Sequence, residues 1–328
     1  MKKFFKGILV FLLIIVLVLG GFLFVFRHRV SLYVNIGKQY LKIKDNPPSS
    51  TDVSSLLTPM ESMDFKDIVY KDTNGVPLTL DIYGPRKKLS NGSPVILYVH
   101  GGSWVYGDKS IPQAISPLFD SFRDEGFTII STSYELIRKT VNFDKQASDV
   151  KDTLRWIYKN KDVYGFNTDE IGVIGTSSGA HLSMLAAYSS DEDFKGDTAL
   201  SNYPSDVKYV IDFFGPTDLT SLDMSTAGWD LDNAIKTTKN TQEMMRKYSP
   251  INYLKEGLPE TLIVHSKKDE VVPFSNSTLL YEKSKEYNNK VELLTLENSG
   301  HDLSDVNRDD VISLATKVLQ FIVKNSPL

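Results

Sequence analysis

The chain has 328 residues, of which 41% are hydrophobic and 24% are charged, and this is enough for one large globular domain or two small ones. The absence of cysteine excludes a cysteine nucleophile, a disulfide framework and thiolate metal ligands, and the five histidines include no H-E-x-x-H zinc pattern. Eight of the 37 Lys and Arg residues precede Asp45, so the remaining 29 stand against all 41 Asp and Glu, and this acidic body is unsuited to binding nucleic acid.

An apolar run without a charged residue extends over residues 7–26, after a short basic tail of residues 1–6. A helix of this length crosses the roughly 30 Å hydrocarbon core of a bilayer. A cleaved signal peptide is the alternative, but its apolar region has ~7–15 residues and ends at small side chains. Here Phe22, Phe24 and Phe26 occupy the end of the run. We therefore expect an uncleaved transmembrane anchor, with the lipid bilayer as a partner of the chain.

The side of the membrane on which the body lies is not decided by charge, because basic residues flank both ends of the apolar run. A short N-terminal tail before one such helix usually stays in the cytoplasm, so we expect a single-pass protein of the cell membrane whose body is extracytoplasmic. Residues 30–44 fit either an amphipathic helix on anionic lipid or a helical stalk. Residues 46–51 contain two prolines and end any helix there. Residues 27–62 thus connect the anchor to the body.

From residue 63 onward, apolar runs of strand length alternate with amphipathic runs of helix length. This alternation predicts an α/β fold with a mostly parallel central sheet and helices on both faces, in which ligands bind beyond the carboxyl ends of the strands. We expect residues 63–328 to form one domain, with residues 216–257 as a possible small cap inserted between two core strands. The expected strands are 65–70, 78–83, 95–99, 127–132, 171–174, 207–214, 261–265 and 291–296, and the expected helices are 112–125, 144–159, the segment behind residue 177, 274–287 and 305–323.

The sequence Gly-Thr-Ser-Ser-Gly at residues 175–179 is a G-x-S-x-G pattern between a predicted buried strand and a predicted helix. A sharp strand-to-helix turn of this kind lifts the hydroxyl of its central serine clear of the sheet. The positive end of the helix dipole then lies just behind Ser177. The pattern alone is weak evidence, since it occurs by chance in roughly one chain in ten of this length. Whether Ser177 is a nucleophile therefore depends on finding a base and an acid elsewhere in the sequence.

A serine hydroxyl needs a base that removes its proton and an acid that fixes the tautomer of the base. His301 follows the last predicted strand, in a loop at the carboxyl edge of the sheet, and is the expected base. His265 ends a buried strand and is expected to be structural, and His181 is expected to pack away from the serine hydroxyl. The expected acid is Asp269, in the loop after the strand that ends at His265, and Asp218 is the alternative.

The sequence His-Gly-Gly-Ser-Trp at residues 100–104 follows the buried strand 95–99. Two consecutive glycines allow the backbone to approach a ligand closely, and hydrolysis of an acyl bond needs N–H groups aimed at the developing oxyanion. The expected brace of this loop is His100. Trp104 and Trp229 are candidates to line a substrate pocket, and a core role fits each of them equally well. The candidate oxyanion donors are the backbone N–H groups of Gly101, Gly102, Ser103 and Ser178.

Together these segments resemble the α/β-hydrolases of the esterase and lipase group, from about residue 65 to the C-terminus. The chain order Ser…Asp…His is the order of that fold. His-Gly-Gly-Ser-Trp is similar to the H-G-G-x-W of small-substrate carboxylesterases, of bacterial feruloyl or acetyl-xylan esterase-like proteins and of kynurenine formamidases. Ser103 in place of a third glycine, and Gly-Thr-Ser-Ser-Gly in place of G-D-S-A-G, distinguish the chain from the hormone-sensitive-lipase branch. The resemblance implies Ser177 as nucleophile, Asp269 as orienting acid, His301 as base, and an oxyanion hole from Gly102, Ser103 and Ser178.

The sequence therefore predicts a membrane-anchored serine hydrolase, a carboxylesterase that cleaves small or medium acyl esters through an acyl-enzyme without a cofactor or a metal. An arylformamidase or amidase, or a lipase, would use the same residues. A non-catalytic binding module on this fold is the alternative from a different class, and such a module typically lacks a triad residue. None of Ser177, Asp269 and His301 is missing here.

Overall fold

The computed structural model describes Val34 and residues 63–73, 75–112, 115–227, 229–301, 303 and 306–326. The expected transmembrane run at residues 7–26 lies outside these residues, as does the 27–62 connection except for Val34. Among the helices that are described, none is long and apolar enough to cross a membrane.

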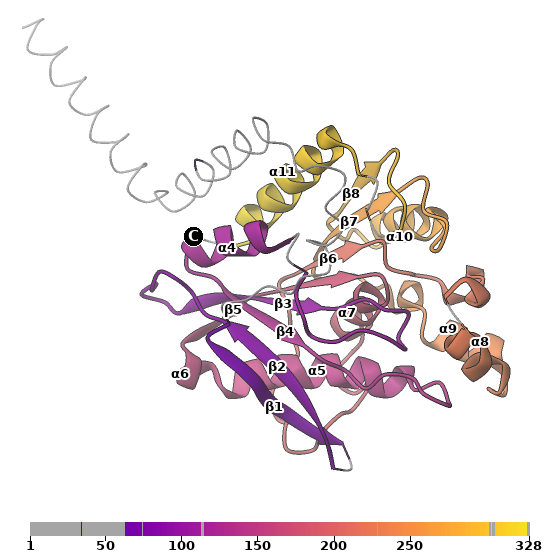
Figure 1. The fold of residues 1–328 in the computed structure, drawn as a ribbon, viewed down its shortest axis with the longest axis horizontal. Coiled ribbons are helices and arrows are strands. Elements are labelled where there is room, and N and C mark those ends of the chain that lie inside the picture. The colour runs from indigo at the N-terminus through magenta and orange to yellow at the C-terminus, as the bar shows by residue number, and fades with distance from the viewer. Residues whose placement is uncertain are drawn as a thin grey trace, which may run out of the picture.

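An eight-stranded sheet runs through the body of the chain in the order β1-β2-β4-β3-β5-β6-β7-β8 (Figure 1). β2 pairs antiparallel with both β1 and β4, and every other neighbouring pair is parallel. The predicted mostly parallel α/β sheet is therefore confirmed. The strands are Phe65–Thr73 (β1), Val76–Tyr83 (β2), Ser93–Val99 (β3), Thr128–Thr132 (β4), Phe166–Thr176 (β5), Tyr209–Phe213 (β6), Glu260–Ser266 (β7) and Val291–Leu296 (β8).

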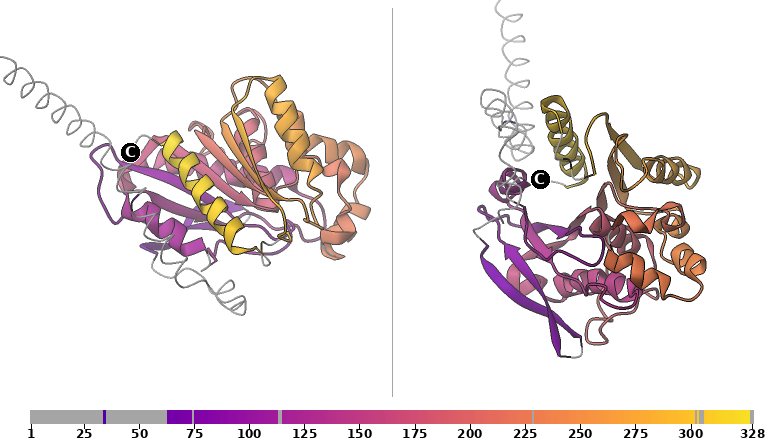
Figure 2. Two further views of the ribbon diagram at one scale, coloured as in Figure 1. Left: turned by 90° about the horizontal axis from the view of Figure 1, so that it is seen from above. Right: turned by 45° about the vertical axis from the view of Figure 1, so that its right-hand side comes forward.

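Helices cover both faces of the sheet, with α5, α7 and α10 on one face and α4 and α11 on the other. Figure 2 shows α11 lying across the sheet. The helices are Ser116–Asp124 (α4), Phe143–Lys159 (α5), Lys161–Tyr164 (α6), Ser178–Tyr188 (α7), Trp229–Lys236 (α8), Thr241–Lys247 (α9), Ser275–Glu286 (α10) and Arg308–Asn325 (α11), with short 3-10 turns at Leu219–Ser221 (η2), Met224–Ala227 (η3) and Pro250–Tyr253 (η4).

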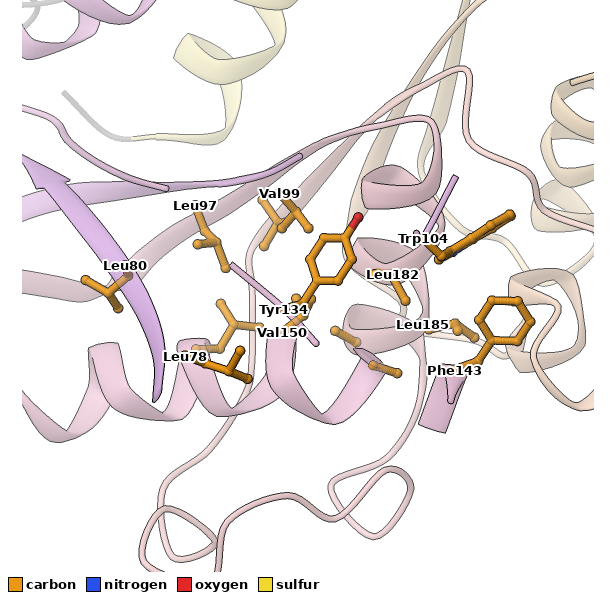
Figure 3. Packing of buried hydrophobic residues seen from close by; sticks show 14 of the residues in the cluster. Leu78, Leu80, Leu97, Val99, Trp104, Tyr134, Phe143, Val150, Leu182 and Leu185 are labelled. Atoms are coloured by element: carbon orange, nitrogen blue, oxygen red, sulfur yellow. The ribbon is translucent and has the colours of Figure 1, made fainter. Parts of the chain in front are cut away.

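The central strand β3 shows why the sheet needs cover on both faces. All seven of its residues are buried, and from Val95 to Val99 its side chains alternate between two hydrophobic clusters. Val95, Leu97 and Val99 pack with the cluster under α5 and α7. Figure 3 shows Leu97 and Val99 facing the helices. Ile96 and Tyr98 pack with the cluster under α4 and α11. A continuous apolar run, rather than an alternating one, is the pattern of a strand buried in this way.

The insertion at residues 216–257 contains η2, η3, α8, α9 and η4. Leu231 and Ile235 of α8 are buried in the same cluster as the side chains of α5 and α7. Met245 and Tyr248, at the end of α9, join that cluster too. These described residues of the insertion therefore pack onto the hydrophobic core of the sheet instead of forming a core of their own.

Asp212 is a carboxyl group in the middle of the sheet, on β6 between Gly175 of β5 and Ile263 of β7. Its Oδ1 accepts a hydrogen bond of 2.7 Å from the N–H of Gly215. Its Oδ2 is buried and has no hydrogen-bond partner among the described residues. Burial raises the pKa of Asp212 to about 7, because the ionised form loses its hydration there.

Asp212→Asn is expected to remove part of the pH dependence of stability. Because the folded pKa lies above the unfolded value, native Asp212 keeps a proton that the unfolded chain has lost, so the free energy of unfolding falls as pH rises from about 4 to about 7 and stays lower above that. Asparagine cannot ionise, so relative to wild type the variant should gain up to about 4 kcal/mol across this window. Urea unfolding at pH 5, 6, 7 and 8 measures this. Asp162→Asn, at an exposed carboxylate, is the control, and parallel pH–stability curves for wild type and Asp212→Asn would contradict the prediction.

Candidate active site

Ser177 lies in the turn between β5 and α7, with φ 51° and ψ −119°, a left-handed backbone conformation that is costly for a residue with a Cβ. Its N–H donates to the carbonyl of Phe213 at 2.9 Å, which ties the turn to β6. A Cβ at Gly175 would approach Ala180 Cα to 2.5 Å, and one at Gly179 would approach the carbonyl oxygen of Val99 to 2.2 Å. The turn can close only because both flanking residues are glycine, and it presents the Ser177 hydroxyl beyond the sheet.

The structure brings together the three side chains that the sequence places on three separate loops. His301 Nε2 lies 2.8 Å from Ser177 Oγ, and His301 Nδ1 lies 2.7 Å from Asp269 Oδ2. Because a carboxylate accepts, Nδ1 carries the proton and Nε2 is left to accept from the serine hydroxyl. The side chain of Asp269 is 1% exposed and that of His301 is 19% exposed, so the acid is shielded while the imidazole reaches the surface.

The carboxylate of Asp269 accepts four N–H hydrogen bonds. Oδ1 accepts from the backbone of Val271 at 2.9 Å and of Val272 at 2.8 Å. Oδ2 accepts from His301 at 2.7 Å and from His265 Nε2 at 3.0 Å. Burial by itself would raise the pKa of Asp269, but the hydrogen bonds from His265 and His301 outweigh it and hold that pKa well below its usual range. Asp269 therefore stays ionised wherever an imidazole can act as a base.

The alternative acid, Asp218, has a different environment. Asp218 Oδ1 accepts from the backbone N–H of Thr220 at 3.0 Å and from the Thr220 hydroxyl at 2.6 Å, so the Asp218 side chain caps the short turn η2. The hydrogen bonds of the His301 ring run to Asp269 and Ser177. Within the described part of the chain, no group of three or more metal-ligating side chains converges.

His265 is fully buried at the end of β7, as the sequence suggests, but its ring also contacts Asp269. The structural role expected for His265 does not include this contact with the candidate acid. The available signal is its position four residues before the expected acid, at the carboxyl end of a strand next to the strand that leads to His301.

The loop after β3 has three consecutive residues in the left-handed region: Gly102 at φ 124°, Ser103 at φ 52° and Trp104 at φ 63°. A Cβ at Gly102 would lie 2.2 Å from the carbonyl oxygen of Tyr106, so glycine is required there. A Cβ at the preceding residue, Gly101, would lie 3.4 Å from Ser177 Cβ, which shows how closely the loop approaches the serine. The N–H groups of Gly102 and Ser103 donate to no acceptor among the described residues.

His100 and Tyr134 brace this loop from below. Their rings stack with centroids 4.3 Å apart, and the Tyr134 hydroxyl donates to the carbonyl of His100 at 3.0 Å. His100 Nδ1 donates to the carbonyl of Gly101 at 2.7 Å. Burial lowers the pKa of His100 to about 4, so the ring is neutral near neutral pH and serves as a rigid spacer. The Tyr134 hydroxyl also lies 3.4 Å from Ser178 Oγ, which links the loop to the start of α7.

Trp104 is anchored through His181. The indole N–H donates to His181 Nδ1 at 3.1 Å, and His181 Nε2 donates to the carbonyl of Tyr248 at 2.7 Å. Burial lowers the pKa of His181 to about 4, which keeps the ring neutral. Trp104 also packs edge-on against Phe143, and the carbonyl of Trp104 accepts from the Gln146 side chain at 2.9 Å. His181 is thus buried away from the Ser177 hydroxyl and joins the loop to the insertion.

A small hollow opens beside Ser177. Trp104, although only 3% exposed, borders it, so this side chain belongs both to the core and to the hollow wall. Trp229, the other pocket candidate, has a side chain outside the described part of the structure. The lining residues are Ser103, Trp104, Ser177, Pro216, Leu222, Asp223, Met224, Val271 and Val272.

The sequence model of the BD-FAE family matches residues 80–284, more than half of the chain. The chain belongs to the BD-FAE family. Its matched segment contains Ser177 and Asp269, while His301 follows it.

Among curated proteins, this BD-FAE member is similar to Esterase LipC of Mycobacterium tuberculosis, with 26% identity over 230 residues that cover 68% of this chain and 56% of LipC. The chain spans about half the length of the curated relatives it matches. Among solved structures it is similar to the thermophilic esterase Est2 of Thermogutta terrifontis, with a TM-score of 0.67 and 25% identity over 85% of this chain and 98% of that one.

A truncated carbohydrate esterase from gut microbiota shares the fold, with a TM-score of 0.67 and 23% identity over 81% of this chain and 98% of that one. Together with the BD-FAE match, these likenesses confirm the predicted resemblance to esterases of the α/β-hydrolase fold.

Proposed function

We propose that this BD-FAE chain is a serine carboxylic-ester hydrolase. The observation that carries the proposal is the continuous hydrogen-bonded row from Ser177 Oγ through His301 to Asp269 Oδ2, with distances of 2.8 and 2.7 Å. Two backbone N–H groups in the loop beside that serine, those of Gly102 and Ser103, donate to no acceptor in the part of the chain that the structure describes. Family membership and relatives named as esterases support the same activity.

In the proposed reaction Ser177 Oγ attacks the ester carbonyl while His301 Nε2 takes the hydroxyl proton. The carbonyl oxygen gains the negative charge and accepts from the N–H groups of Gly102, Ser103 and Ser178. Each such donor contributes about 2.7–4 kcal/mol to lowering the barrier. Asp269 holds the Nδ1–H of His301 and stabilises the imidazolium that forms.

The tetrahedral intermediate then collapses. The bond to the alcohol oxygen breaks, His301 Nε2 returns its proton to that oxygen, and the acyl group stays on Ser177. A water molecule next gives a proton to His301 and attacks the acyl carbon. The second collapse restores the Ser177 hydroxyl and releases the carboxylic acid. Apart from the ester and this water molecule, the proposed steps use side chains and backbone groups of the chain.

We expect the acyl group to lie in the hollow beside Ser177, which the Met224 side chain, 6% exposed, borders. Met224→Ala is expected to raise the ratio of kcat/KM for p-nitrophenyl hexanoate over the acetate by about threefold to tenfold, since each methylene that becomes buried contributes about 0.8 kcal/mol. Met184→Ala, in a buried cluster on α7 and β6, is the matched control and should leave the ratio unchanged. A ratio that stays constant in both variants would place the acyl group elsewhere.

Substrate class is tested on the purified body with p-nitrophenyl acetate, longer esters, an aryl formamide and a micellar ester. Faster turnover of the monomeric esters supports the carboxylesterase. A preference for the formamide would indicate an arylformamidase, and activity confined to micelles would indicate a lipase. No turnover of any of these compounds by an intact, folded chain would exclude an ester hydrolase.

We also propose that residues 7–26 anchor the chain in the cell membrane with the catalytic body outside the cytoplasm. The support is the length of the uncharged apolar run and the short tail before it. An impermeant fluorophosphonate applied to intact cells should label Ser177 in the membrane fraction. Labelling that appears only after the cells are lysed would place the body in the cytoplasm.

A further inference from the structure

We propose that His265 is a positioning residue that fixes Asp269 and divides its hydrogen-bonding capacity between two imidazole rings, an inference that rests on the proposed function. Asp269 Oδ2 accepts from the rings of both His265 and His301, at 3.0 and 2.7 Å. The His265 ring is fully buried, so its contact with the carboxylate is not exchanged for water.

The partners of His265 fix its tautomer. Nε2 lies 3.0 Å from the carbonyl oxygen of Val272 as well as 3.0 Å from Asp269 Oδ2. Because a carbonyl only accepts, Nε2 must carry a proton. Nδ1, 2.6 Å from the hydroxyl of Ser277 on α10, then accepts from that hydroxyl in the neutral ring. The Phe274 ring packs edge-on at 5.6 Å and holds the imidazole in its plane.

This tautomer supplies Asp269 with a second imidazole donor. Both carboxylate oxygens are then held by two N–H groups each, so the carboxylate cannot rotate away from His301. The N–H of His265 also withdraws negative charge from Oδ2, the oxygen that accepts from His301. Asp269 therefore attracts the protonated ring of His301 less strongly. Among the described residues, the titratable side chains that face Asp269 are His265 from β7 and His301 from the loop after β8.

His265→Phe keeps a planar ring and removes the donor. We expect kcat/KM to fall on the order of tenfold, because a charged acceptor loses a buried hydrogen bond. We also expect the acid limb of the kcat/KM–pH profile to move up by about half to one pH unit, because the undivided carboxylate favours protonated His301 more strongly. His265→Gln offers an N–H at similar reach. It should therefore recover part of the lost kcat/KM and show a smaller shift of the acid limb.

The matched control is Tyr188→Phe. It removes a buried hydrogen bond of 2.9 Å to Thr261, at the opposite end of the same strand β7. This variant should lower Tm without moving the acid limb. A limb that moves equally in the control, or stays in place in His265→Phe, would reduce His265 to a packing residue.

A measurement on the wild-type protein covers the case in which His265→Phe does not fold. Nitrogen-15 NMR of histidine-labelled protein, with His265 assigned through His265→Gln, should show a protonated Nε2 and an unprotonated Nδ1. The reverse tautomer would overturn the inference, since Nε2 would then have no proton to donate. If the wild-type protein hydrolyses esters and His265→Phe has the same kcat/KM–pH profile, this inference is overturned and the proposed function stands. If the wild-type protein hydrolyses no ester, both the proposed function and this inference are overturned.

Discussion

Ser177→Ala is expected to lower kcat for p-nitrophenyl acetate by at least about 10⁴-fold. In the proposed reaction the oxygen of this hydroxyl forms the acyl bond, and its hydrogen bond of 2.8 Å to His301 gives it a base that can take its proton. Alanine keeps the Cβ and the backbone geometry of the turn, so the fold should survive. The N–H groups of the loop after β3 remain, and in the proposed mechanism they support the residual rate.

The measurement is steady-state hydrolysis together with fluorophosphonate labelling of the same preparations. Ser183→Ala is the matched control, because this serine follows Ser177 by six residues, on α7, and its hydroxyl donates to the carbonyl of Gly179 at 2.7 Å. It should keep its label and most of its activity. If Ser177→Ala is still labelled, the nucleophile is another residue.

The sequence predicts the centre of most elements better than their ends. β5 was expected at 171–174 and extends over Phe166–Thr176. Its added N-terminal part, with polar Asn167 and Asp169, carries no strand pattern, and it joins the sheet because β3 pairs with it through Ser93 across an irregularity in register. That pairing is a tertiary contact, which no local pattern reveals.

Helix ends show the same limit. The last helix was expected from residue 305 and begins at Arg308, where the side chain of Asn307 accepts from the N–H of Asp310. Asparagine is a good N-cap, so the sequence does offer Asn307 as the start of the helix. Other polar residues just before it in the sequence are equally plausible N-caps. The exact cap depends on where the loop from His301 reaches the helix.

The candidate site was more predictable than its supports. Ser177, Asp269 and His301 each follow a strand of the parallel region, and carboxyl ends of parallel strands meet at one edge, so the topology alone brings them close. The support that Trp104 receives from His181 joins residues 77 positions apart. Such contacts depend on how helices settle on the sheet, and neither composition nor periodicity encodes them.

Asp269→Asn is expected to lower kcat by about 10³- to 10⁴-fold with a smaller change in KM. Both oxygens of Asp269 face two N–H donors, so an amide NH₂ group must point at donors whichever way it turns. If it points at His301, the NH₂ group donates to Nδ1, and the ring proton moves to Nε2. Nε2 can then no longer accept the proton of Ser177.

Asp218→Asn separates this reading from the alternative acid. Asp218 caps η2 through Thr220, so its amide variant should lose some stability and keep most of its activity. Rates for both variants are compared with the same ester at pH 7, 8 and 9. Because the defect of Asp269→Asn is a misplaced proton, raising the pH should not recover its rate. Full activity in Asp269→Asn, with a large loss in Asp218→Asn, would transfer the orienting role to Asp218.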